Sequence, residues 1–267
     1  MTRLGLIAGN GVFPLQVARA ARRDGVEVIA VAHQGETDPA LAELVESITW
    51  IKVGELQRMV DSFKSAGVTT AAMAGGIARS SLPAAFAPDM RALAMLQRIG
   101  RFSDDAVLRG VARELEAEGI AIIDPVPMLE DVITRPGVVS GPEPSAAQLR
   151  DLELAFNVAR AVGGFDIGQA VAVRDGVVAA VEAVEGTDEA LRRAAKLCGP
   201  GLVVAKAAKP GQDLRFDRPA IGPATIELLA EIGAAMIGIE AGTAMLLERG
   251  QIIDRAQALG VTVFGYG

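Results

Sequence analysis

Cysteine and histidine are almost absent from this sequence, which has one of each, Cys198 and His33, among its 267 residues. A single cysteine excludes a disulfide framework and favours a reducing compartment. One cysteine and one histidine are also too few ligands for a structural zinc site built from these residues. Any metal is therefore expected to be a hard cation held by oxygen atoms, such as Mg²⁺.

The sequence also has few aromatic residues, no net positive charge and no long apolar run. Aromatics make up 4% of the residues and the net charge is −7. These values argue against base stacking, against a phosphate-backbone footprint and against bulk electrostatic attachment to an anionic membrane. The most apolar stretch, 232–247, is interrupted by Glu240 and is too short to span a bilayer. Because 51% of the residues are hydrophobic, we expect a globular protein. The few aromatics and the negative net charge predict that it has no nucleic-acid partner.

Strand and helix patterns alternate in short units through the first half of the sequence. This alternation predicts a parallel sheet covered by helices, and so a Rossmann-like α/β domain over residues 1–133. The predicted strands lie at 3–8, 26–33, 47–53, 68–76 and 119–125.

The texture of the sequence changes after the first half. Residues 134–145 are rich in proline, glycine and serine and are predicted to be a linker. Beyond them, Asp175–Gly176 between two apolar runs indicates a β-hairpin. Residues 146–267 are therefore predicted to form a mixed α/β catalytic domain with an antiparallel component.

Glycine turns follow two of the predicted N-terminal strands. Gly9–Asn10–Gly11 and Gly75–Gly76 stand where parallel sheets bind ligands, so they indicate either contacts with a phosphate or ordinary tight turns. A dinucleotide fingerprint would have a third glycine where Pro14 stands. It would also have an acidic residue at the end of the second strand, where His33 and Gln34 stand, so NAD binding is disfavoured.

Several other polar residues have a structural explanation beside a functional one. Ser103 is a natural N-cap for a helix whose first turn holds Asp104 and Asp105. Glu185 and Thr187 flank a helix start that suits an anion and equally suits simple capping. A lone histidine at a strand end, as His33 is, is expected to be structural.

A strip of charged residues between 205 and 218 is the strongest candidate for catalysis. Lys206 and Lys209 end a predicted strand, and Asp213, Arg215 and Asp217 alternate so that an extended backbone would put all three on one face. Cations to neutralise phosphate charge and carboxylates to hold Mg²⁺ or orient water are what phosphoryl transfer needs. A salt-bridged loop is the alternative, and we favour the functional interpretation.

The helix start after this strip lacks the acidic residue that the position favours. It reads Gly222–Pro223–Ala224–Thr225, where proline suits the first helical turn. The next position lies at the positive end of the helix dipole, yet it is occupied by Ala224.

The motifs together resemble one enzyme family. In order, the sequence contains LGLIAGNGVFP, AMAGGI, SDDAVLR, VVAAVEAVEGTDEAL, VVAKAAKPGQDLRFDRPAIGP and GIEAGT. Nearly end to end, it resembles the UDP-2,3-diacylglucosamine pyrophosphatases of lipid A biosynthesis in their alphaproteobacterial form, which are unrelated to the calcineurin-like enzymes. The resemblance implies a two-domain enzyme that hydrolyses its substrate with Mg²⁺ to UMP and 2,3-diacylglucosamine 1-phosphate (lipid X).

We assign the candidate residues roles in this reaction. Asp213, Asp217 or the carboxylate missing at position 224 would hold Mg²⁺, while Lys206, Lys209 and Arg215 would bind phosphate oxygens. The family's loop usually has an aspartate, a proposed catalytic or metal-binding group, at the position of Ala224, so we expect this chain to be an inactivated, substrate-trapping variant. The residues expected to contact the substrate are Gly9, Asn10, Gly11, Gly75, Gly76, Glu185, Thr187, Gly222 and Thr225.

The resemblance also implies binding partners, and two rival functions stay open beside it. The resemblance implies binding of UDP-2,3-diacylglucosamine or lipid X and a cytoplasmic location with peripheral contact to the inner membrane. A homodimer is expected only because it is the commonest assembly. The rivals are a Rossmann-like NAD(P) oxidoreductase and a non-catalytic protein that binds a nucleotide sugar or lipid.

Overall fold

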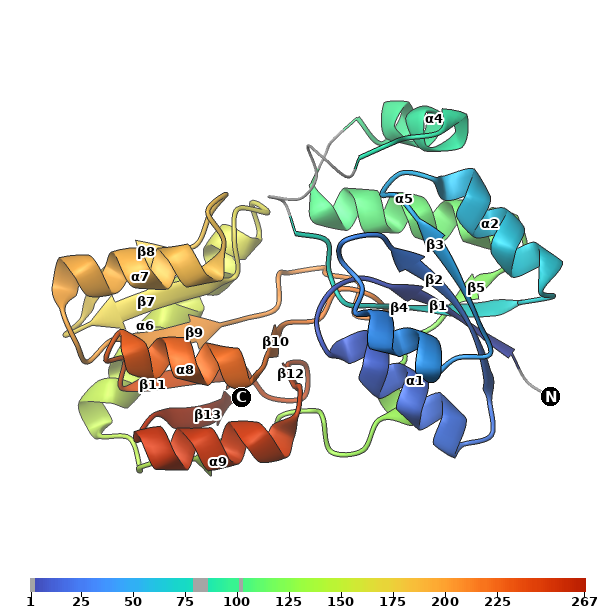
Figure 1. Ribbon diagram of the computed structural model, residues 1–267. Coiled ribbons are helices and arrows are strands. Elements are labelled where there is room, and N and C mark those ends of the chain that lie inside the picture. Colours follow the sequence, from blue (N-terminus) through green and yellow to red (C-terminus); the bar gives the residue numbers. More distant parts are fainter. Residues whose placement is uncertain (1–2, 79–85, 101–102) are drawn as a thin grey trace. The chain divides into compact units, whose positions relative to one another are not determined.

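Two units make up the fold of this computed structural model, which describes residues 3–78, 86–100 and 103–267 (Figure 1). Unit 1 comprises Met1–Glu130 together with Asp213–Asp217, and unit 2 comprises Asp131–Gln212 and Arg218–Gly267. A short piece of the second half of the sequence therefore belongs with the first half.

Unit 1 contains the predicted Rossmann-like parallel sheet. Its five strands lie in the order β3-β2-β1-β4-β5 and are all parallel. They are β1 (Arg3–Ala8), β2 (Glu27–His33), β3 (Ser47–Ile51), β4 (Thr70–Ala74) and β5 (Ala121–Ile122). The sheet's central strands are apolar almost throughout, because helices cover both faces.

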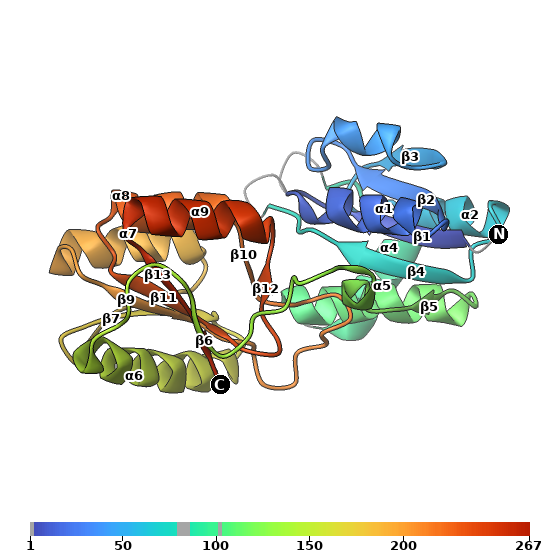
Figure 2. The same cartoon turned by 90° about the horizontal axis from the view of Figure 1, so that it is seen from below.

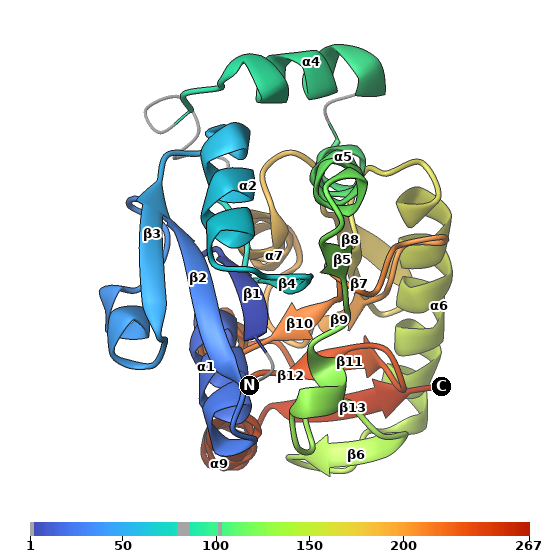
Figure 3. The same cartoon turned by 90° about the vertical axis from the view of Figure 1, so that its right-hand side faces the viewer.

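The helices of unit 1 are divided between the two faces of its sheet. They are α1 (Phe13–Arg23), α2 (Leu56–Ser65), α4 (Met90–Ile99) and α5 (Asp104–Ala117), with short 3₁₀ turns η1 (Pro39–Glu43) and η2 (Val126–Met128). Figure 3 shows α1 on one face and α2 and α5 on the other. On that second face, Phe63, Met95 and Leu115 from three helices meet in one apolar cluster with the sheet.

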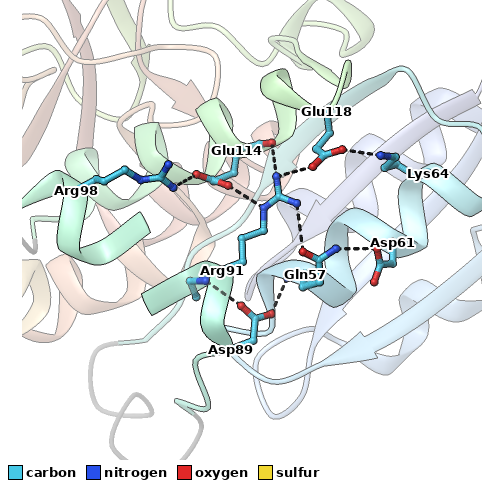
Figure 4. A network of polar contacts seen from close by, with 9 residues as sticks. Gln57, Asp61, Lys64, Asp89, Arg91, Arg98, Glu114 and Glu118 are labelled. Atoms are coloured by element: carbon cyan, nitrogen blue, oxygen red, sulfur yellow. Dashed lines mark hydrogen bonds and ion pairs between the residues drawn. The ribbon is translucent and has the colours of Figure 1, made fainter. Parts of the chain in front are cut away.

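An ion-pair network holds α4 to its neighbours in unit 1 (Figure 4). Arg91 Nε lies 2.7 Å from Glu114 Oε2, and Arg91 Nη2 lies 2.8 Å from Glu118 Oε1. Lys64 on α2 pairs with Glu118 at 2.6 Å, and Arg98 also contacts Glu114. The network fixes the inner face of α4, because the side chain of Arg91 is only 18% exposed.

The start of α4 is joined to α2 by one carboxylate. Asp89 Oδ1 accepts a hydrogen bond from Ala92 N at 2.8 Å and so caps the helix. Its second oxygen, Oδ2, accepts a hydrogen bond from Gln57 N at 2.6 Å. One aspartate therefore satisfies backbone donors at the beginnings of two helices (Figure 4).

Unit 2 is built on a mixed sheet of six strands in the order β6-β13-β11-β9-β7-β8. β9, β11 and β13 are parallel to one another, and β6, β7 and β8 supply the antiparallel component. The strands are β6 (Gly137–Ser140), β7 (Ala170–Arg174), β8 (Val177–Val181), β9 (Val203–Lys206), β11 (Met236–Glu240) and β13 (Thr262–Tyr266). The predicted mixed α/β class is confirmed.

The helices of unit 2 enclose its sheet from both sides. They are α6 (Ala146–Gly163), α7 (Thr187–Cys198), α8 (Pro223–Glu231) and α9 (Arg249–Leu259), beside a small parallel pair, β10 (Ala220–Ile221) and β12 (Met245–Leu246). Figure 2 shows α6 on one face of the sheet and α7, α8 and α9 on the other. No helix among the described residues has the length and apolar character to cross a membrane.

The Asp175–Gly176 hairpin is confirmed, and the predicted linker differs from expectation. Asp175 and Gly176 both have positive φ, 48° and 78°, as a two-residue turn between β7 and β8 requires. Within 134–145, however, Gly137–Ser140 forms β6, which pairs antiparallel with β13. Its β-branched Val138 and Val139 favour a strand. Residues 137–140 are therefore an edge strand of the sheet of unit 2 and not part of an unstructured linker.

Candidate functional site

The two glycine turns of unit 1 meet backbone to backbone. Asn10 N donates to Gly76 O at 2.7 Å, and Gly9 N donates to Ala74 O at 2.8 Å. A Cβ added to Gly9 would lie 2.2 Å from Gly76 O, and one added to Gly75, whose φ is +80°, would lie 2.2 Å from Asn10 O. The structure thus brings these predicted site residues together, and close chain packing alone accounts for glycine at positions 9 and 75.

The side chain of Asn10 is held inside the same turn. Its Nδ2 donates to Glu36 Oε2 at 2.9 Å, and that carboxylate oxygen also accepts from Ala78 N at 3.0 Å. Asn10 Oδ1 accepts from Gly76 N at 3.3 Å. Glu36 therefore organises both turns, and the sequence pattern did not single it out.

His33 has the structural role that its isolation in the sequence indicated. It is buried, and its Nδ1 lies 2.9 Å from Ala8 O, which also accepts from Thr37 Oγ1 at 2.6 Å. Because a carbonyl oxygen can only accept, Nδ1 carries the proton. Burial lowers the pKa of His33, so the ring is neutral at pH 7.

The segment 213–217 folds as a turn and not as the extended strip expected from its alternating charges. Asp213 Oδ1 accepts from Arg215 N at 3.2 Å, while Phe216 N and Asp217 N both donate to Asp213 O, at 3.2 and 3.0 Å. Aspartate favours this kind of local turn, because its side chain bonds the backbone two residues on. Phe216 packs against the apolar cluster of unit 1 and anchors the segment there.

Asp213 is engaged by guanidinium groups in unit 1. Arg215 donates to both carboxylate oxygens, Nε to Oδ1 at 3.0 Å and Nη2 to Oδ2 at 2.8 Å. Arg109 lies 3.7 Å away from Oδ2 and also binds Asp105 at 2.7 Å. The hydrogen bonds from Arg215 hold the pKa of Asp213 below its usual range and raise the pKa of the arginine in return.

This arrangement does not fit the expected Mg²⁺ ligand. Both oxygens of Asp213 are taken by Arg215, whose Nη1 also pairs with Glu116 at 2.9 Å. Within residues 3–78, 86–100 and 103–267, no group of three histidine, cysteine, aspartate or glutamate side chains is placed to hold a metal ion. The ion-paired turn thus matches the salt-bridged alternative of the sequence analysis more closely than a metal site.

Lys206 and Lys209 lie in unit 2, at and just beyond the carboxyl end of β9. Lys206 Nζ donates to Ala220 O at 2.9 Å, and Lys209 Nζ pairs with Asp166 Oδ1 at 2.6 Å. Their positive charges therefore stand at the strand end, where α/β sheets bind ligands. Asp166, a partner of Lys209, carried no sequence signal.

Glu240, at the end of β11, fixes the loop that follows β9. Its Oε2 accepts from Ala208 N at 2.9 Å, and its Oε1 pairs with Arg160 Nη2 at 2.8 Å. The sequence analysis noted Glu240 only as an interruption of an apolar stretch. The signal that finds it is a charged residue closing a buried strand in the motif GIEAGT.

Glu185 and Thr187 have protein partners near the start of α7. Glu185 pairs with Arg193 at 2.6 Å, and the hydrogen bond from that arginine lowers the pKa of Glu185. Thr187 Oγ1 donates to Glu182 Oε1 at 2.8 Å, and Glu182 Oε2 accepts from Ala170 N at 2.9 Å. The first turn of α7 is therefore tied to β7 through Glu182.

The start of α8 is open by comparison. Gly222 is the N-cap in extended conformation, with φ −129°, and among the described residues no heavy atom beyond its own and its chain neighbours' lies within 4 Å of where its Cβ would be. Thr225 N donates to Gly222 O at 3.0 Å, and Ala224 is exposed in the first turn, which holds no acidic residue. The positive end of this helix dipole is thus available to an anion or to a carboxylate at position 224.

The predicted catalytic residues are divided between the units. Asp213, Arg215 and Asp217 belong to unit 1, whereas Lys206, Lys209 and Ala224 belong to unit 2. Each unit therefore carries part of the set that the sequence analysis grouped in one strip.

Comparison with known proteins gives two family matches and a full-length relative. The model of the LpxI N-terminal domain matches residues 3–132, and that of the LpxI C-terminal domain matches residues 135–264. A Caulobacter vibrioides protein, UDP-2,3-diacylglucosamine pyrophosphatase LpxI, is 34% identical over 278 residues, covering 99% of this chain and 98% of its own length.

Solved structures resemble the chain only weakly. The biotin carboxylase subunit of a pyruvate carboxylase is 17% identical with a TM-score of 0.29, over 74% of this chain and 43% of that one. A biotin carboxylase domain of Hydrogenobacter thermophilus 2-oxoglutarate carboxylase is 18% identical with a TM-score of 0.28, over 66% and 36%. The chain thus spans less than half the length of these structures.

Proposed function

This chain belongs to the LpxI family, and we propose that it is built to hydrolyse the pyrophosphate bond of UDP-2,3-diacylglucosamine, giving UMP and 2,3-diacylglucosamine 1-phosphate in lipid A synthesis. The observation that carries the proposal is the relative of that name, which is 34% identical across 99% of the chain.

The local chemistry of unit 2 supports this proposal. Lys206 and Lys209 place two ammonium groups at the end of a parallel strand, where Lys206 donates to a carbonyl oxygen and Lys209 to Asp166. A pyrophosphate would exchange these contacts for charge-assisted hydrogen bonds to its own oxygens. The open start of α8 adds backbone N–H groups that favour negative charge.

We propose direct attack of water on phosphorus, without a covalent enzyme intermediate. The single cysteine, Cys198, and the buried neutral His33 offer no paired nucleophile and base. Stabilisation of the charge that develops on the phosphate oxygens is then the main contribution of the protein. In unit 2 that contribution comes from Lys206 and Lys209.

We propose that Ala224 leaves the enzyme strongly impaired. The resemblance puts a carboxylate at this position, and the loss of a catalytic carboxylate slows turnover by at least ~10²-fold. Because Ala224 is exposed at the start of α8, an aspartate there has room and is favoured by the helix dipole.

Restoring the carboxylate tests both parts of the proposal. The variant Ala224→Asp should release UMP from UDP-2,3-diacylglucosamine at least ~100 times faster than the parent chain. Ala224→Asn is the matched control, because it has nearly the same shape without the charge and should give no comparable gain. If both variants stay as slow as the parent while binding the substrate, the chain is a non-catalytic binding protein and the proposal fails.

We also propose that turnover depends on Mg²⁺. This rests on the resemblance, because the carboxylate of Asp213 is held by Arg215 and does not fit a metal ligand as it stands. EDTA should abolish UMP release by Ala224→Asp, and added Mg²⁺ should restore it. Activity that survives EDTA would remove the metal from the proposal.

Peripheral contact with the cytoplasmic face of the inner membrane and assembly as a homodimer complete the proposal. The substrate carries two acyl chains, and α4 exposes Met90 and Leu93 by 81% and 41% on its outer side. Sedimentation with phospholipid vesicles tests the first property, and the molar mass in solution tests the second.

A further inference from the structure

Glu240 is an acidic side chain placed next to a lysine that we propose to bind phosphate. It ends β11, and the register of β11 with β9 pairs the preceding Ile239 with Lys206. Its side chain is only 19% exposed. A mostly buried carboxylate at this place opposes the binding of a phosphate, because like charges repel. Its presence therefore needs an explanation other than contact with the substrate.

Both carboxylate oxygens of Glu240 are engaged within unit 2. Oε2 accepts from Ala208 N at 2.9 Å, and Oε1 pairs with Arg160 Nη2 at 2.8 Å. The guanidinium of Arg160 lies over the stacked rings of Phe156 and Tyr266, 5.5 and 5.9 Å from their centroids. These cation–π contacts hold Arg160 between α6 and β13, and Arg160 in turn holds the carboxylate that binds Ala208.

Lys206 and Lys209 differ in how their backbone is fixed. Lys206 is the last residue of β9 and pairs with a residue of β7 on one side and of β11 on the other. Ala207 N still donates to the β7 side, to Gln169 O at 3.0 Å. Ala208 N donates instead to the side chain of Glu240. Glu240 therefore holds the backbone directly before Lys209, whereas the strand ladder holds Lys206.

The end of α6 contacts the same loop from another direction. A Cβ added to Gly163 would lie 3.4 Å from Lys209 Cα, so the helix packs directly against this residue. Asp166 Oδ1, just beyond the helix, accepts from Lys209 Nζ at 2.6 Å. The ammonium group of Lys209 is thus placed by α6 and Asp166, and its backbone by Glu240.

We infer that Glu240 is a positioning residue for Lys209. The inference rests on the proposed function, in which Lys209 binds the pyrophosphate. Without the carboxylate, Ala208 N loses its partner, so the loop is no longer fixed and Lys209 is held less precisely. The charge of Glu240 alone would act in the opposite direction, because removal of a negative charge favours an anion.

Equilibrium binding of UDP-2,3-diacylglucosamine, measured by titration calorimetry, separates these two effects. Glu240→Ala should weaken binding by ~10-fold, the scale of one lost charge-assisted hydrogen bond. Glu240→Gln keeps an oxygen that can accept from Ala208 N, so its affinity should stay within ~3-fold of the parent's. If only charge matters, both variants bind more tightly than the parent.

Combination with lysine variants distinguishes positioning from a general weakening of the fold. In Lys209→Ala, the further change Glu240→Ala should weaken binding by less than ~2-fold, because the side chain through which Glu240 acts is gone. In Lys206→Ala, the same change should still cost ~10-fold. Glu231→Ala is the matched control: it breaks an ion pair with Arg192 at the end of α8 away from Gly222, and it should bind as the parent does.

Three results would overturn the inference: unweakened binding by Glu240→Ala, equal losses in the two lysine backgrounds, or an equal loss in Glu231→Ala. Melting temperatures above that of the assay confirm that the variants fold. If Glu240→Ala does not fold, Glu240→Thr takes its place, because threonine favours a strand and its side chain is shorter by two bonds. A parent chain that does not bind the substrate, or a Lys209→Ala variant that binds it equally well, would instead contradict the proposed function.

Discussion

The glycines that precede two helices, Gly9 before α1 and Gly222 before α8, stand in opposite surroundings. A Cβ at Gly9 would meet Gly76 O at 2.2 Å, and one at Gly222 would meet no described heavy atom within 4 Å outside its chain neighbours. Gly222 also has φ −129°, which any residue can adopt. The fold requires glycine at position 9 and leaves position 222 free.

The difference teaches how to separate glycines that the fold requires from glycines that it does not require. Serine, threonine, asparagine and aspartate are at least as good as glycine at an N-cap, so neither sterics nor capping explains Gly222. We propose instead that glycine at this position lets a ligand approach the backbone closely. Side chains can be separated in the same way. Contacts within the protein hold Arg91, whereas Ala224 is exposed.

The largest effect on folding is expected from Gly9→Ala. The new methyl group meets backbone atoms that have no flexible side chain to move aside, so unfolding should become easier by about 3 kcal/mol or more. Urea denaturation of the parent and the variant measures this difference. A loss below ~1 kcal/mol would contradict the close packing of the two turns.

Arg91→Met should come next, because it leaves Glu114 and Glu118 in the network of Figure 4 without their shared partner. We expect a loss of roughly 2–3 kcal/mol, since Arg91 and Glu114 are mostly buried. Arg98→Met is the control, because Arg98 contacts the same Glu114 from a side chain that is 64% exposed. It should cost less than ~1 kcal/mol. Equal losses in urea denaturation would contradict the difference between them.

A smaller, pH-dependent effect is expected from Asp213→Asn. Arg215 depresses the pKa of Asp213 in the folded chain, so the pair stabilises the fold above the unfolded pKa of ~3.9. That stability is lost as the pH falls through the folded pKa. The variant should therefore be less stable than the parent at pH 7, and the gap should shrink as the pH falls below ~4. Melting temperatures measured across this range check the sign, and a gap that widens in acid would be inconsistent with the ion pair.

The smallest effect on folding is expected from Gly222→Ala. Stability should fall by about 1 kcal/mol at most, because alanine is a poorer N-cap than glycine. Binding of UDP-2,3-diacylglucosamine should nevertheless weaken by ~10-fold if the ligand approaches this backbone. Gly250→Ala, in α9, is the control, because a Cβ there also meets no described heavy atom within 4 Å apart from its chain neighbours and its own helix backbone. Equal binding by both variants would remove the functional reason for Gly222.

Much of the fold could be predicted because its signals are local. Apolar runs of strand length alternate with helical patterns in unit 1, and Asp175–Gly176 specifies its turn through positive φ. The prediction of a linker over 134–145 missed strand β6 for a local reason as well. The prolines and glycines of this segment indicate a loop, and its two valines form a strand only by pairing with β13, which lies far along the chain.

The site was harder to predict because its contacts are long-range. Asp213, Arg215 and Asp217 were expected on one face of an extended strip, but Asp213 turns the chain and Arg215 reaches Glu116, which is 99 positions away. Asp166 and Glu240 carried no strong signal, because a single acid after a helix or strand has many ordinary explanations. Their partners, Lys209 and Arg160, are far away in the sequence and are brought next to them only by the fold.

By itself the sequence determined the alternation of strands and helices, the absence of cysteine–histidine chemistry, the family, and the missing acid at Ala224. These follow from composition and from patterns within a few residues. Only the tertiary structure decided that Gly9 and Gly75 are needed for each other, that Asp213 is occupied by arginine, and that 213–217 belongs with unit 1. The physical reason is that hydrogen bonds and steric contacts join atoms close in space, as Asn10 and Gly76 are across 66 positions of sequence.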